Sequence, residues 1–113
     1  MSDDLAELRQ YVVEEIVETR EPIFFGELVY MVTEITRATD SSEDPRRRAR
    51  DVAAQLVREG TLRPGEHTGG TFVPWPTGPE ESADRILAAV DALIRDNVQP
   101  LPGQVCYLDL PAR

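Results

Sequence analysis

Apolar residues recur at intervals of three and four positions in four separate stretches of the chain, the spacing of amphipathic helices. The stretches lie within 3–19, 26–36, 45–59 and 77–97. In the first, Leu5, Leu8, Val12 and Ile16 share one face and glutamates occupy the opposite face. The pattern therefore predicts four helices with one buried face each.

The third helix has the strongest start and stop signals. Asp44 can accept a hydrogen bond from an unpaired amide at the helix start, and Pro45 at the first helical position has no amide to satisfy. Gly60 can adopt the left-handed backbone conformation that commonly ends a helix. Its buried stripe is expected to be Ala49, Val52, Ala53, Leu56 and Val57.

Short apolar runs between these helices predict strands. One is Ile23–Phe25, which follows Pro22, and two more at 61–63 and 71–73 enclose the turn-rich segment 64–70. The sequence favours a last strand at 105–110. The fold class is therefore mainly α with a small β-hairpin, an α+β fold with an additional C-terminal helix and an extended tail.

The segment after the hairpin predicts a buried tryptophan at the edge of the core, followed by a capped helix. Trp75 lies between two prolines, and a lone tryptophan is more often buried over the core edge than exposed for stacking. Thr77 and Glu80 have capping-box spacing, and Pro79 suits an early helical position. We therefore expect the last helix to start at Thr77.

Charge is strongly segregated along the chain. The 113 residues carry 21 acidic and 12 basic side chains, a formal net charge of −9, and every basic side chain is an arginine. Such acidity argues against a general binder of polyanions, and favours solubility through self-repulsion or a basic partner. If the protein works in concentrated salt, the acidic surface would instead be an adaptation to the solvent. Half of the arginines nevertheless lie within 46–63, at Arg46, Arg47, Arg48, Arg50, Arg58 and Arg63.

Several functional classes are excluded or disfavoured. Cys106 and His67 are the single cysteine and histidine, so one chain holds neither an internal disulfide nor a Cys/His zinc site. No catalytic motif or cofactor-binding loop occurs, which predicts a protein that is not an enzyme and has no cofactor. No apolar run is long enough to cross a bilayer and the acidic start is unlike a signal peptide, so we expect a cytoplasmic protein.

The arginines of the third helix are the candidate binding residues. Helical spacing places positions 47, 50, 51, 54 and 58 away from the buried stripe, so Arg47, Arg50 and Arg58 are expected to face outward together. Such a face can enter the major groove of DNA. The alternative is a solvated face whose arginines pair with acidic residues of the same molecule. Arg63 and His67 are expected in the loop 64–70 or beside it.

The order of helix, short strand, two helices and hairpin over residues 3–76 resembles the winged helix-turn-helix superfamily. In particular, AAQLVREGTLRPGEHTGGTFVPW is similar to its recognition helix, wing and return strand. The resemblance implies a recognition helix at 45–59 and a wing that contacts DNA near 63–70. The loop 37–44 is longer than the usual turn, and the chain is more acidic than most DNA-binding members of the superfamily.

We therefore expect a winged-helix domain at 1–76, a C-terminal helix at 77–97 that packs on the core or dimerises, and a proline-containing tail at 98–113. The expected function is a homodimeric transcriptional regulator that binds duplex DNA. Its nucleic-acid contacts would be Arg46, Arg47, Arg50, Arg58, Arg63 and His67. The alternatives are an adaptor that binds another protein, or a non-catalytic subunit of a larger complex.

Overall fold

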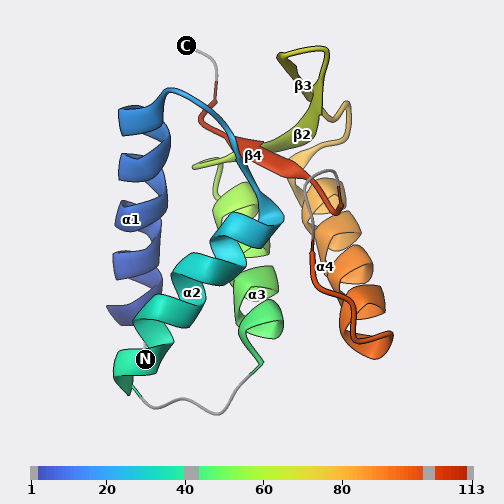
Figure 1. Ribbon diagram of the computed structural model, residues 1–113. Helices are drawn as coiled ribbons and strands as arrows, with labels where there is room; N and C mark the ends of the chain where they lie inside the picture. The colour runs from blue at the N-terminus through green and yellow to red at the C-terminus, as the bar shows by residue number, and fades with distance from the viewer. Residues whose placement is uncertain (1–2, 40–43, 101–103, 112–113) are drawn as a thin grey trace.

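The computed structural model describes residues 3–39, 44–100 and 104–111. Within these ranges the chain forms four helices and a four-stranded antiparallel sheet (Figure 1). In chain order the elements are α1 (Asp3–Thr19), β1 (Ile23–Phe24), α2 (Phe25–Thr39), α3 (Pro45–Arg58), β2 (Arg63–Thr68), β3 (Thr71–Pro74), α4 (Pro79–Arg95) and β4 (Tyr107–Asp109). The mixed α+β class is thus confirmed, whereas the winged-helix assignment stays a prediction.

The strand order of the sheet is β1-β4-β2-β3, so the strand from the tail lies between β1 and the hairpin. Leu108 of β4 is in register with Ile23 on one side and with Pro64 on the other. The strand predicted at 105–110 is confirmed over its central residues. The tail therefore completes the sheet, because β1 and β2 have no ladder with each other.

The predicted helices are present with small changes at their ends. α1 has the predicted bounds, and α2 begins one residue early and continues to Thr39, which shortens the loop predicted at 37–44. Residues 40–43 of that loop and the side chain of Ile35 lie outside the described part. In α3 the Asp44 carboxylate accepts from the Arg46 amide at 2.9 Å, and Gly60 has φ +83°, as the capping signals predicted.

The hairpin corrects the sequence prediction, which placed a loop over residues 64–70. β2 instead continues to Thr68, and β3 begins at Thr71. The turn between them consists of Gly69 and Gly70. Both glycines have positive φ, 60° and 80°, as a two-residue turn with matching twist requires. His67 therefore lies in a strand, paired with Phe72.

The start of α4 also differs from the prediction. Gly78 is the residue before the helix and no side chain caps it, so the capping box from Thr77 to Glu80 does not form. The Thr77 hydroxyl instead hydrogen-bonds that of Ser82. The early helical position of Pro79 is confirmed.

The core lies between the helices and one face of the sheet. α3 is in its middle and packs against α2 on one side and α4 on the other (Figure 1). Ile86 and Val90 of α4 belong to the same buried cluster as Leu56 of α3, so the seam of α4 covers the core of its own chain. Trp75 is buried, as predicted. In the described ranges, no helix is long and apolar enough to span a bilayer.

Candidate binding surfaces

The face of α3 that was expected to be open is partly covered by α4. Ala54, placed outward by helical spacing, is only 1% exposed. The Arg50 guanidinium pairs with Asp91 of α4 and with Asp51. Burial opposes the charge of Arg50, but its hydrogen bonds to the two carboxylates outweigh burial and raise its pKa. The expectation that Arg47, Arg50 and Arg58 form one open face with Ala54 is therefore wrong.

Arg58 and Arg46 also have carboxylate partners within the chain. Arg58 pairs across the helix interface with Glu80 at 3.4 Å and with Asp84 at 3.5 Å. Arg46 hydrogen-bonds Asp44, which holds the pKa of that carboxyl below its usual value. Arg46 also donates to the Val98 carbonyl, so it ties the start of α3 to the segment after α4.

Arg47 is exposed, as is Arg58, whereas Arg46 and Arg50 are partly buried. The Arg47 guanidinium has no hydrogen bond or ion pair to another residue of the described segments, although its charge helps to lower the pKa of Asp44. Four arginines were predicted to bind DNA from this helix. Of these, Arg47 alone can bind an external anion without first leaving a partner among the described residues.

Arg63 and His67 lie on the sheet, at the opposite end of the molecule from the start of α3 (Figure 1). Side chains alternate along β2, so both share one face of the sheet. The Arg63 guanidinium carbon is 5.5 Å from the centre of the Phe72 ring, and the His67 ring is 5.3 Å from that of Tyr107. The six predicted contacts thus divide between two separate regions.

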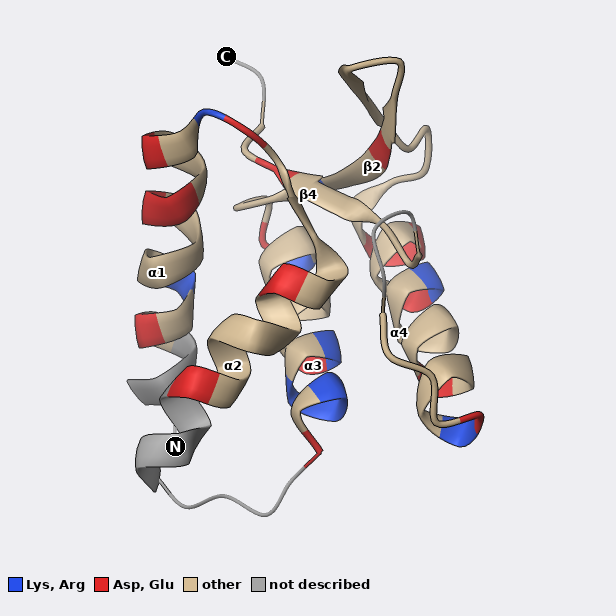
Figure 2. Cartoon of the chain, in the orientation of Figure 1, with Lys and Arg blue, Asp and Glu red and all other residues tan. Residues whose placement is uncertain are grey.

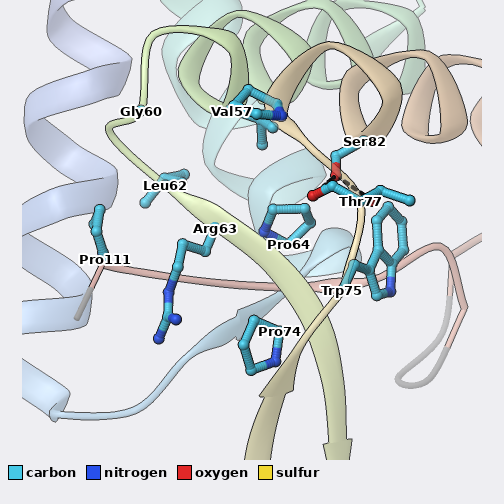
Figure 3. Close-up of a pocket in the computed structure, with 11 residues that line it drawn as sticks. Val57, Gly60, Leu62, Arg63, Pro64, Pro74, Trp75, Thr77, Ser82 and Pro111 are labelled. Carbon is cyan, nitrogen blue, oxygen red and sulfur yellow. Dashed lines mark hydrogen bonds between the residues drawn. The ribbon is translucent and has the colours of Figure 1, made fainter.

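A mostly apolar pocket of about 290 Å³ lies beside the root of the hairpin (Figure 3). Its walls include Val57, Leu62, Pro64 and Trp75, with Arg63 at one side. The Arg63 Nε atom is buried with no hydrogen-bond partner in the described residues. Figure 3 shows its guanidinium turned away from Trp75, so the pocket does not join the cation to the indole.

The described side chains form no metal site, and Ser82 and Cys106 are both buried. No group of three or more potential ligands is gathered among them to hold a metal ion. Ser82 hydrogen-bonds Thr77, and Cys106 is buried. Burial raises the pKa of the Cys106 thiol to about 12, which keeps it protonated at neutral pH.

A second surface lies over α1 and α2, where two tyrosines are exposed. Tyr11 is 44% exposed and Tyr30 is 65% exposed. They line a hollow of about 340 Å³ that also includes Glu15, Phe24 and Met31. A second hollow of about 230 Å³ shares Tyr11 and Glu15, and adds further glutamates of α1. We call the two hollows together the α1–α2 groove.

Acidic residues predominate along α1 and α2, the two helices that line this groove (Figure 2). Residues 6–34 contain seven glutamates and two arginines, and one of these, Arg9, pairs with Glu59 beyond this segment. Glu15 and Glu18 have no side-chain partner in the described ranges. The glutamates are evident in the sequence, but the groove is not. The available signal was that Tyr11 and Tyr30 fall outside the buried stripes of their helices.

Comparison with protein-family models, with curated protein sequences and with solved structures finds no match to this chain.

Proposed function

We propose that this protein is a non-catalytic interaction module that binds a basic surface of another protein through the acidic side of α1 and α2. The observation that carries this proposal is the distribution of paired charge. Arg50 and Arg58 are neutralised by carboxylates of α4, whereas the acidic residues beside the α1–α2 groove have few cationic partners in the described chain. Apart from exposed Arg47, the charge that remains available to a partner on these helices is therefore mainly negative.

Duplex DNA is the alternative partner, with the protein as a transcriptional regulator. Exposed Arg47 favours it, as does the position of Arg63 and His67 beside aromatic rings on one sheet face. Reading the major groove with Arg50 and Arg58 would require both to leave the carboxylates of α4. The net charge of −9 would also repel the phosphates. These two costs place DNA binding second.

The proposal includes a cytoplasmic location and allows a role as a non-catalytic subunit. A homodimer would need surfaces other than the seam of α4, because Ile86 and Val90 are already buried in the core of their own chain. Val17 of α1 is 58% exposed and is available to such an interface.

Fluorescence anisotropy with two probes tests the proposal. A labelled hexa-arginine peptide represents a basic partner, and a short mixed-sequence DNA duplex represents the alternative. The peptide should bind at low salt and weaken as salt screens the charges, while the duplex should not bind. A labelled hexaglutamate peptide is the control for non-specific adhesion. Binding of the duplex without the peptide would contradict the proposal and restore the regulator hypothesis.

A further inference from the structure

The α1–α2 groove has aromatic walls and an acidic rim. Tyr11, Phe24 and Tyr30 line its larger hollow, together with Glu15 and Glu27. The Glu27 carboxylate accepts a hydrogen bond from the Phe24 amide at 3.3 Å, so it serves the junction between β1 and α2. Glu15 has no such bond to its carboxylate in the described chain. Its charge is therefore available at the point where the two hollows meet.

The wall formed by Phe24 is held by the backbone behind it. A Cβ atom at Gly26 would lie 2.5 Å from the Phe24 ring and 2.5 Å from the Pro100 carbonyl oxygen. The glycine thus permits a close approach that a larger residue would disrupt. The Phe24 ring also contacts Tyr107, with 6.3 Å between the ring centres. This wall is therefore fixed by the fold rather than formed only when a ligand arrives.

Aromatic walls combined with carboxylates favour one kind of side chain. The faces of aromatic rings attract cations, and a guanidinium can lie flat against a ring while it bonds a carboxylate. An anionic side chain would meet Glu14, Glu15 and Glu18 around the second hollow. A purely apolar side chain would fill the larger hollow but leave these charges without a partner. Charge and shape together select a cation on an apolar stem.

We propose that the α1–α2 groove binds an arginine side chain of a basic partner segment. Its stem and guanidinium lie against Tyr11 and Tyr30, and its charge pairs with Glu15. This inference rests on the proposed function, since it names the place and the chemistry by which a basic partner is recognised. Binding at this groove differs from general attraction to an acidic surface, because it depends on particular side chains.

The test measures binding of the labelled hexa-arginine peptide to the native protein and to substituted proteins at low salt. Tyr30→Ala removes a wall of the groove, and Tyr30→Phe keeps the ring. Because Tyr30 is exposed, neither change should unfold the protein. We expect affinity about two- to five-fold weaker for Tyr30→Ala, the range for an exposed cation–aromatic contact, and little change for Tyr30→Phe.

A matched pair of glutamate substitutions separates the site from the overall charge. Glu15→Gln and Glu7→Gln each remove one negative charge from α1, but only Glu15 lines the groove. We expect a larger loss for Glu15→Gln. Equal losses of affinity in the two glutamate variants, or full affinity in Tyr30→Ala, would overturn the proposal that the groove binds arginine. The proposal of an interaction module would still stand. Failure of the native protein to bind the peptide would overturn both proposals.

A spectroscopic measurement locates the contact directly. Amide NMR shifts are followed while N-acetylarginine amide is added, with N-acetylcitrulline amide as the uncharged analogue of similar shape. Shifts that cluster around Tyr11, Glu15 and Tyr30 with the arginine compound alone support the proposal. Shifts elsewhere, equal shifts with both compounds, or no shifts with either would contradict it.

Discussion

The guanidinium of Arg50 in α3 pairs with the carboxylate of Asp91 in α4. Forty-one positions separate the two residues, and neither helix alone indicates the contact. The pair joins α3 to α4 and removes Arg50 from the set of arginines available to a partner. One contact between helices thus changes the interpretation of the whole basic cluster.

This pair should contribute measurably to stability. In a double-mutant cycle of Arg50→Ala and Asp91→Ala, we expect a coupling free energy of about 0.5–1 kcal/mol, because Asp91 is still half-exposed to solvent. Urea unfolding of the four proteins gives the coupling. A cycle of Arg47→Ala with Asp91→Ala is the control and should show none. A zero coupling in the first cycle would contradict the pairing.

The burial of Ala54 shows that α3 is packed at this position, where the sequence predicted an open face. Ala54→Leu inserts extra volume between α3 and α4 and should lower the free energy of unfolding by about 1–3 kcal/mol. The neighbouring substitution Gln55→Leu is at an exposed position and serves as the control. Thermal and urea unfolding measure both. An unchanged Ala54→Leu protein would show that this face is open in solution.

The tail strand should be essential for the fold, because Leu108 is fully buried between β1 and β2. Leu108→Ala is expected to cost about 2–5 kcal/mol of unfolding free energy. Val73→Ala, at a half-exposed position of the hairpin, should change it by less than about 0.5 kcal/mol. Equal effects from the two substitutions would show that β4 is not part of the folded sheet in solution.

Asp44 should support α3 in a pH-dependent way. Its hydrogen bond with Arg46 lowers its pKa, so the stabilisation is present above pH 3.8, the ordinary pKa of the group, and is lost as pH falls through the lower folded value. Asp44→Ala should cost about 1 kcal/mol at neutral pH. Urea unfolding at a series of pH values should show the difference shrinking under acid. A constant difference would argue against ionised Asp44 as the cap.

Cys106 should affect stability at alkaline pH. Its pKa is about 12 in the folded chain against 9.0 for an ordinary thiol, so folding keeps the proton and stability falls as pH rises from 9 toward 12. Cys106→Ala should show a shallower decline in that range, measured by urea unfolding. At pH 8 the native thiol should react with a disulfide reagent far more slowly than the denatured thiol. Rapid native labelling would contradict its burial.

Local signals in the sequence predicted the secondary structure well. The three-and-four spacing of apolar residues specified the helices, and Asp44, Pro45 and Gly60 specified the bounds of α3, because helix ends depend on groups a few positions apart. The hairpin was only partly predicted. Gly69 and Gly70 form a tight turn that lets the strands extend through Pro64 and His67, where composition alone suggested a loop.

What the sequence determined by itself was the set of amphipathic elements and the segregation of charge. Only the tertiary structure decided which charges remain available, because ion pairs such as Arg58 with Asp84 join residues far apart in the chain. A helical wheel shows which side of α3 avoids the stripe, but it does not show that α4 pairs with Arg50 and Arg58 on that side or that Ala54 is buried. The same holds for the α1–α2 groove, since Tyr11 and Tyr30 line one hollow only when the two helices pack.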